Sequence, residues 1–421
     1  MDLRSSLSPL GERQFRFLFA GQLISLAGTA MAPIALAFAV LDLGSASDLG
    51  FVLAAGWAPQ IVFILVGGVW ADRLPRNLVI VAANVVSGAA QSVIACLLLL
   101  DRAQLWHLIA LQVVRGVATS FFFPASAGIV PHTVAATQLQ QANALLRLSQ
   151  NTTNIFGALA AGALVATVGS GWAIAFDAAT YFASAAILTR MRVRGPLAAG
   201  QRSFIGELME GWQEFVSRTW LWTVVVAASV GNLVWVGGQA VLGPVVAKES
   251  LGGAAGWGGV VAGEAVGLVV GSLVALRWRP ERPLFTSVIL LGATPLFLAA
   301  LAIPAGLPIV IAVAAIAGFG LEIFNVNWIT TMHEQIPDEV LARVNSYDAL
   351  GSFVFIPIGL TVAGPAADAI GVAGALWAAA GIAVFAMLGA LLSRDVRQLT
   401  RLRAASTSPL PDAEPVPPPI R

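Results

Sequence analysis

Long apolar runs fill most of this chain and determine the solvent in which it can fold. We count twelve of them, each near the length of about 20 residues with which an α-helix crosses the hydrocarbon core of a bilayer. Backbone amides find no water in hydrocarbon, so each run must satisfy its own hydrogen bonds by forming a helix. The sequence therefore predicts an all-α membrane protein with 12 transmembrane helices.

The composition fits a lipid environment. Only 11% of the 421 residues are charged and 58% are hydrophobic, whereas a soluble domain carries about 25% charged residues.

The first six runs lie at 15–41, 49–71, 78–100, 105–127, 145–168 and 172–188. The second six lie at 220–246, 257–276, 284–301, 309–332, 350–367 and 372–392.

Basic residues collect on one side of the predicted spans. Twelve spans place both termini on the same side, which receives twenty arginines, against Arg102 and Lys248 on the other side. Because cytoplasmic loops of membrane proteins are enriched in Lys and Arg, we expect both termini in the cytoplasm. The first run is much longer than the apolar region of a signal peptide, so a permanent helix is expected there.

A polar connector divides the runs into two halves. Apolar residues recur in it at helical spacing from Phe204 to Val216, which predicts an amphipathic helix on the inner membrane surface. The tail is rich in proline and is expected to be disordered. The expected domains are a cytoplasmic N-terminus (1–13), a six-helix bundle (14–190), a cytoplasmic linker with the amphipathic helix (191–218), a second six-helix bundle (219–394) and a disordered cytoplasmic tail (395–421).

The two halves share a spacing of small and polar residues. The first half has Asn143, Gly157, Gly162 and Gly169, and the second half has Asn345, Gly359, Gly364 and Gly371. Both sets are spaced 14, 5 and 7 residues apart, and the second set lies 202 residues after the first. This pattern predicts two six-helix pseudo-repeats.

A short charged turn follows the second run, with Gly68, Asp72, Arg73 and Arg76. This pattern resembles the signature loop of the major facilitator superfamily, which latches the two halves of a transporter together on the cytoplasmic side. The stretch that begins with Arg115-Gly116 is similar to the fourth helix of drug and siderophore exporters. Over about residues 10 to 400 the chain resembles the macrolide, multidrug and siderophore exporter branch. The resemblance implies a major facilitator fold and a gating role for the four loop residues.

Three charged residues lie well away from the ends of predicted spans: Arg115, Glu264 and Glu322. Each costs about 2.5–3.5 kcal/mol at the bilayer centre on insertion scales, and we therefore expect them to serve substrate or proton coupling. Arg115 and Glu322 lie at equivalent depths in the two halves, so they could pair across a shared cavity in one state and separate in another. A structural role, as members of buried pairs, stays open for all three.

Other polar residues complete the predicted site. Thr29 stands where the related exporters often have Asp, which moves the expected proton route to Glu264 or Glu322. Asp177 is expected near the outer face, within reach of water, and Asp348 is expected as an acid in the first turn of its helix. The residues expected to line the cavity are Gln22, Gln112, Asn151, Asn154, Gln239 and Asn325.

Catalytic and cofactor motifs are missing from the sequence. It has no phosphate-binding loop of the ATPase type, no metal-ligand spacing among its three histidines and no nucleophile–base arrangement. We therefore expect a transporter rather than an enzyme, with no cofactor and no metal. The expected partners are the lipid bilayer, a small-molecule substrate and protons, and a net charge of +1 argues against nucleic acid. A monomer in the plasma membrane is expected.

The predicted function is export of a small, largely hydrophobic molecule, such as a drug, a macrolide or a siderophore-like compound. Transport would proceed by alternating access, in exchange for protons that buried carboxylates bind and release. Two alternatives stay open at this point. One is an importer or facilitator on the same fold. The other is a non-transporting membrane sensor, because Thr29 and Ala275 stand where acids are expected, Ala275 in the loop of the second half that corresponds to the charged turn.

Overall fold

The described part of the chain consists of helices joined by short turns and loops. The computed structural model describes residues 7–71, 75–191, 204–303 and 305–401, and these ranges contain helices and no strand. The first half comprises η1 (Ser8–Gly11), α2 (Arg13–Thr29), α3 (Ala32–Leu43), α4 (Ala46–Ala71), α5 (Arg76–Leu99), α6 (Leu105–Ile129), η2 (Val130–His132), η3 (Ala136–Gln138), α7 (Leu139–Val168) and α8 (Ser170–Leu188). The second half comprises α9 (Phe204–Ser217), α10 (Thr219–Val236), η4 (Gly237–Leu242), α11 (Gly243–Ser250), α12 (Gly253–Ala275), α13 (Pro283–Leu290), α14 (Ala293–Ala302), α15 (Leu307–Gln335), α16 (Asp338–Phe353), α17 (Ile356–Leu392) and α18 (Arg394–Gln398).

The described residues form 11 segments that are long and apolar enough to cross a membrane. The last segment, Arg343–Leu392, has 50 residues, whereas one crossing requires about 20. It turns at Gly371, where φ is 78°, a backbone conformation that favours glycine. The repeat partner Gly169 has φ 91° and separates α7 from α8 in the same way. The all-α membrane fold is confirmed, and the count of twelve crossings stays a prediction.

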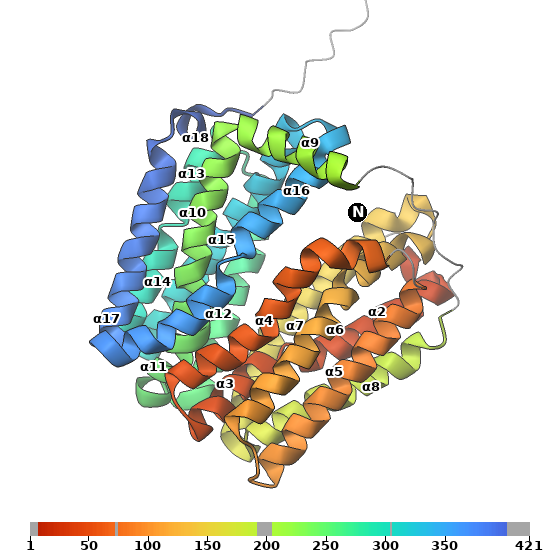
Figure 1. The fold of residues 1–421 in the computed structure, drawn as a ribbon, viewed down its shortest axis with the longest axis vertical. Helices are drawn as coiled ribbons and strands as arrows, with labels where there is room; N and C mark the ends of the chain where they lie inside the picture. The colour runs from red at the N-terminus through yellow and green to blue at the C-terminus, as the bar shows by residue number, and fades with distance from the viewer. Residues whose placement is uncertain (1–6, 72–74, 192–203, 304, 402–421) are drawn as a thin grey trace, which may run out of the picture.

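The helices form two bundles that meet at one end only. Figure 1 shows α2–α8 and α10–α18 joined where α3 and α11 lie and diverging toward α9 and α16; we call these the joined end and the divergent end. One apolar core contains buried residues of both bundles, such as Ile34 and Leu360. Two further cores belong to single bundles, one around Phe15 in the first half and one around Trp328 in the second. Apolar packing therefore holds the halves together at the joined end.

Small residues allow the backbones of the two bundles to touch. A Cβ on Gly162 of α7 would lie 2.6 Å from the carbonyl oxygen of Ala254 at the start of α12. A Cβ on its repeat partner Gly364 of α17 would overlap the backbone of Ser47 in α4. A larger side chain at either position would push these helices apart. Close packing through small residues is common in membrane helix bundles. The repeated glycines thus have equivalent positions in the contact between the halves.

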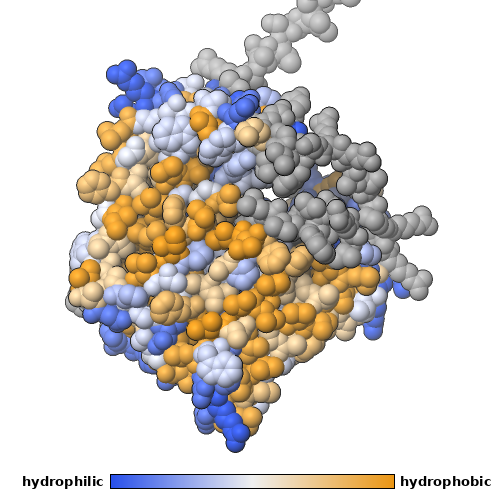
Figure 2. Space-filling view, in the orientation of Figure 1, coloured by the Kyte–Doolittle hydropathy of each residue, from blue (hydrophilic) through white to orange (hydrophobic). Residues whose placement is uncertain are grey.

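The outer surface of the molecule is suited to acyl chains. Figure 2 shows a broad hydrophobic belt across this face, with hydrophilic residues gathered toward both ends of the view. Large apolar side chains are exposed elsewhere too, since Phe385 and Leu392 of α17 are each 80% exposed, which is unfavourable in water. Lipid is therefore the solvent of this surface.

Helix α9 is present where the connector predicts a helix. Its Trp212 and Phe215 rings lie 5.8 Å apart and both approach Tyr347 of α16, at 5.4 and 6.1 Å between ring centroids. The aromatic face of α9 therefore packs on the second bundle. Its placement on a membrane surface stays a prediction.

We predict that Gly364→Ala destabilises the protein, because the added methyl group would overlap the Ser47 backbone. The cost of overpacking a tight contact is about 1–3 kcal/mol. Gly381 lies in the same helix with open space around its Cβ position, so Gly381→Ala is the matched control and should be neutral or stabilising. Thermal unfolding of both purified variants tests this, and equal melting temperatures would contradict the close contact.

Candidate functional site

A cavity of about 470 Å³ opens on the inner side of the second bundle. Helices α10 and α13–α17 form most of its wall, and Trp57 of α4 is the contribution of the first bundle. Its lining is mainly apolar, as expected of a site for a small organic molecule. The aromatic lining residues are Trp57, Trp235, Phe324, Trp328 and Phe353.

Asp348 places a carboxylate in this aromatic cavity. Trp328 Nε1 donates to its Oδ2 at 3.1 Å, and Ser352 Oγ donates to its Oδ1 at 3.3 Å. Asn232 Nδ2 donates to the carbonyl oxygen of Ser352 at 2.9 Å. A negative charge among aromatic faces is suited to a cation with an apolar body.

The position of Asp348 differs from the sequence-based expectation. It was expected in the first turn of a helix, but α16 begins ten residues earlier, at Asp338. Helix α16 includes the largely polar segment from Asp338 to Asn345, which precedes the predicted apolar run. The apolar run alone therefore does not show where the helix begins. The carboxylate is therefore a cavity group rather than a helix-terminal acid.

Glu264 and Glu322 lie on neighbouring helices beside the cavity, but neither is among its lining residues. Gln239 Nε2, in the π-helical turn η4, donates to Glu264 Oε2 at 3.2 Å. Ser272 Oγ of α12 donates to Glu322 Oε1 of α15 at 2.6 Å. Both carboxylates are thus held by neutral donors within the second bundle.

Arg115 has its polar neighbours in the first bundle. Its Nη1 donates to Gln112 Oε1 at 3.1 Å, and its charge also acts on the Tyr181 hydroxyl. Among the described residues, no ion pair joins Arg115 to Glu322 in this conformation. The predicted pairing across the halves is therefore not formed in this state, and its role in another state stays a prediction.

Asp177 is the polar residue that sequence reasoning misplaced. It was expected within reach of water, but it is 0% exposed. Gln91 of α5 donates to its Oδ2 at 2.5 Å, and the charge of Arg115 acts on it. The short distance to Trp172 in the sequence suggested exposure, whereas the packing of α2 and α5 on α8 covers the carboxylate.

The remaining predicted lining residues are dispersed. Asn325 lines the cavity. Gln22 donates to Ser126 Oγ at 2.6 Å between α2 and α6, and Gln112 is buried beside Arg115. Asn151 and Asn154 are exposed on α7.

The predicted gating loop is described only in part. Gly68 lies near the end of α4, whereas Asp72 and Arg73 fall outside the described residues. Arg76, at the start of α5, donates from Nη1 to the carbonyl oxygen of Gly128 in α6. This contact fixes the start of α5 against the end of α6.

Polar contacts accompany the apolar packing at the joined end. Lys248, the single lysine of the chain, lies in the last turn of α11 and donates to Asp42 Oδ1 at 2.6 Å and to the carbonyl oxygen of Leu41 at 2.7 Å. Ser47 Oγ donates to Asp368 Oδ2 at 2.7 Å. Both contacts cross between the halves, and so they close the molecule at this end.

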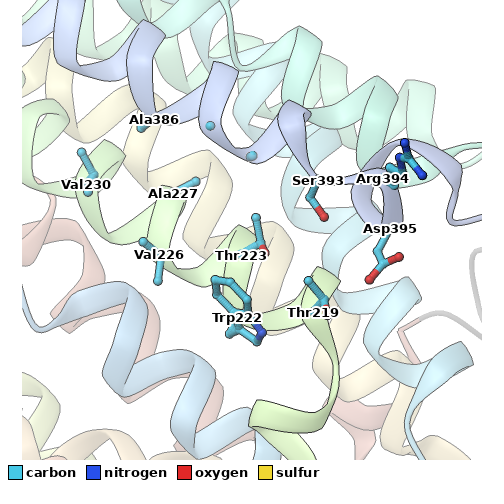
Figure 3. Close-up of a pocket in the computed structure, with 12 residues that line it drawn as sticks. Thr219, Trp222, Thr223, Val226, Ala227, Val230, Ala386, Ser393, Arg394 and Asp395 are labelled. Atoms are coloured by element: carbon cyan, nitrogen blue, oxygen red, sulfur yellow. The ribbon is translucent and has the colours of Figure 1, made fainter.

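A second hollow of about 630 Å³ lies on the other side of the contact between α10 and α17. Figure 3 shows Ser393, Arg394 and Asp395 at one end of it, opposite Thr219, with Val226 and Val230 farther along α10. Three alanines border both this groove and the central cavity: Ala227, Ala386 and Ala390. A thin wall of small side chains therefore separates the two spaces.

Comparison with known families identifies one that spans most of the chain. The model described as "Major Facilitator Superfamily" matches residues 18–347. Macrolide efflux protein A of Streptococcus pyogenes is 24% identical over 367 residues, which cover 85% of this chain and 90% of that protein. Multidrug efflux pump Tap of Mycolicibacterium fortuitum is 26% identical over 371 residues, which cover 84% of this chain and 89% of that protein.

Solved structures share the fold. A bacterial homologue of the human lysosomal transporter Spinster, in an inward-facing and unoccupied conformation, aligns with a TM-score of 0.71 at 15% identity. The alignment covers 96% of this chain and all of that one. The nucleoside transporter NupG aligns with a TM-score of 0.71 at 11% identity, covering 90% of this chain and 98% of NupG. At these identities the likeness extends to the fold.

We predict that Lys248→Glu weakens the joined end, because it replaces attraction to Asp42 with repulsion. An exposed ion pair contributes about 0.2–1 kcal/mol, and salt reduces this contribution. The charge-swapped double variant, with Asp42→Lys added, should regain part of the lost stability. Melting temperatures of the two single variants and the double variant, at low and high salt, test the contact. Additive effects in this cycle would show that the pair contributes nothing.

Proposed function

Because the chain belongs to the Major Facilitator Superfamily, we propose that it exports a small, largely hydrophobic molecule across the plasma membrane in exchange for protons. The cavity carries this proposal: five aromatic side chains and one carboxylate line a space of about 470 Å³. Such a lining suits drug-like molecules, and especially cationic ones. The two curated relatives described above are an efflux protein for macrolides and a multidrug efflux pump.

The arrangement of the halves supports transport by alternating access. One core joins both bundles, while the two other cores each stay within one bundle. The bundles can thus rock as rigid bodies about the cavity if the joined end separates while the divergent end closes. In this proposal the loop residues Gly68, Asp72, Arg73 and Arg76 latch the divergent end when it closes.

The distribution of arginines supports an orientation for this motion. The divergent end carries α9 and α18, and Arg218, Arg394, Arg397 and Arg401 lie within or directly after these helices in the sequence. By the positive-inside rule this end and both termini face the cytoplasm. The conformation described here would then be open toward the inside, and the protein would work as a monomer, because each chain contains a complete cavity.

Arg115, Glu264 and Glu322 are the proposed coupling groups. Glu264 and Glu322 accept hydrogen bonds from neutral donors, and their contacts bridge η4 to α12 and α12 to α15. A proton that binds either carboxylate removes a charge from between packed helices, and this changes which arrangement of those helices is favoured.

Vesicles that contain the purified protein test the proposal. A pH gradient, acidic on the side opposite the termini, should drive uphill movement of a macrolide away from the side of the termini, with protons moving in the opposite direction. Movement of the macrolide without proton flux would indicate a facilitator, and movement with the protons would indicate an importer. Absence of transport for macrolides, cationic dyes and iron chelators would favour the sensor alternative.

We predict that Glu322→Gln abolishes proton-coupled transport while the protein stays folded, since an amide keeps the size of the side chain but cannot bind a proton. Glu249→Gln is the control, because Glu249 is exposed at the end of α11. Accumulation of a dye in vesicles, driven by a pH gradient, measures coupled transport, and gel filtration shows whether the variant is folded. Wild-type accumulation by Glu322→Gln would remove this residue from the mechanism.

We further predict that Asp348→Asn weakens binding of a cationic dye at least tenfold more than binding of a neutral analogue, because the cavity loses its charge. A tenfold difference corresponds to about 1.4 kcal/mol. Equilibrium binding to the detergent-purified protein measures both affinities. An equal change for the two ligands would mean that Asp348 has no direct electrostatic contact with the ligand.

A further inference from the structure

Asp177 is a buried carboxylate to which neither the cavity nor the predicted site assigns a role. It lies on α8 within the first bundle, is 0% exposed and is absent from the cavity lining. An ionised carboxylate in such surroundings requires compensation by donors or by an opposite charge. The contacts of its two oxygens show how far this compensation goes.

The two carboxylate oxygens of Asp177 have different surroundings. Oδ2 accepts a hydrogen bond from Gln91 at 2.5 Å, whereas Oδ1 is buried with no hydrogen-bond partner. Helix α2 covers the unpaired oxygen, because a Cβ on Gly28 would lie 2.6 Å from Oδ1. An unpaired buried oxygen is unfavourable for a carboxylate, but a protonated carboxyl group removes most of this cost.

Arg115 provides the opposite charge but does not fully pair with Asp177. Its Nη1 donates to Gln112 and its charge acts on the Tyr181 hydroxyl, which accepts a hydrogen bond from Thr29 Oγ1 at 3.1 Å. Its Nε atom is buried without a partner. The charges of Arg115 and Asp177 act on each other, yet the two are not among the ion pairs found within 4 Å. Asp177 Oδ1 and Arg115 Nε are therefore both available to form further hydrogen bonds in another conformation.

We propose that Asp177 is a proton-binding site of the first bundle, and that its protonation state sets how firmly Arg115 is held there. This inference rests on the proposed proton exchange and adds a site to it. A hydronium ion transfers its proton to Oδ1, so one O–H bond breaks as another forms, and the proton is later transferred back to water on the other side. While Asp177 is charged it attracts Arg115, and protonation ends this attraction, so Arg115 can turn toward the space between the halves.

The position of Asp177 suits exchange with the outside. It lies seven residues after Ser170, which corresponds to about 10 Å from the start of α8 at a rise of about 1.5 Å per residue. This start is at the joined end, beside Gly169 at the end of α7. Separation of the halves at that end would shorten the path from Asp177 to water, whereas the present arrangement encloses it.

Few other charges act on Asp177. Helices α2, α3, α5 and α7 pack on α8. Their titratable side chains are Arg13 and Arg16 on α2, Asp42 on α3, Arg76 and Cys96 on α5, and Arg147 on α7. Among all described groups, only Arg115 and Tyr181 have an electrostatic interaction with the Asp177 carboxylate. The proposed pH response therefore has one titrating acid and two identified neighbours.

The test follows the joined end as pH changes. The full chain with Cys96→Ser, Thr167→Cys and Ser250→Cys is spin-labelled at the two exposed positions, one in each half, and reconstituted without substrate. We expect acidification to lengthen the distance between the labels. Asp177→Asn should abolish this response, Asp177→Glu should retain it, and Asp101→Asn, in an exposed loop, should leave it unchanged.

The outcomes separate this inference from the proposed function. An unchanged pH response in Asp177→Asn overturns the inference and leaves proton exchange through Glu264 or Glu322 intact. No pH response in the parent protein, with vesicle transport that moves no protons, overturns both. If Asp177→Asn does not fold, Gln91→Leu is used, because it removes the one hydrogen bond to the carboxylate without removing the acid. If Gln91→Leu shifts the pH midpoint of the change in label distance, the inference is supported, and an unshifted pH midpoint contradicts it.

Discussion

Backbone contact between the halves at the joined end is the constraint on which the rest of this structure depends. In lipid, helices gain little from hiding apolar surface, so association relies on close packing of small residues. Gly162 and Gly364 provide that packing at equivalent positions of the two repeats. The contact fixes how far the bundles diverge at the other end, and thereby sets the position of Trp57 against the cavity of the second bundle.

The polar groups of the interior follow from the same environment. Three carboxylates within the membrane-length helices each have a donor on a neighbouring element: Gln91 for Asp177, Gln239 for Glu264 and Ser272 for Glu322. A neutral donor supports a carboxylate without the rigid geometry of an ion pair. Such groups can therefore change protonation without dismantling the bundle, which suits an exchanger of protons.

Sequence patterns were sufficient for the fold, because membrane-length apolar runs leave the backbone one solution. The repeat of Asn143 and Asn345 with their glycines also identified residues that occupy equivalent positions. The site was harder to predict. Hydrophobic periodicity shows that Glu322 is within a span but not which neighbour it faces. The sequence-based expectation that Asp177 reaches water was wrong because its burial depends on how α2 packs, which the local sequence does not show. Asp348 was missed for a related reason, since polar residues conceal the true start of α16.

The three alanines between the cavity of the second bundle and the second hollow have a mechanical consequence. Ala227, Ala386 and Ala390 present single methyl groups where α10 meets α17. Methyl groups interlock less deeply than branched side chains, so this seam offers little resistance when one helix slides along the other. Such a slide would enlarge one hollow as it narrows its neighbour, and the lateral pressure of the surrounding acyl chains would then affect the room available to a bound molecule.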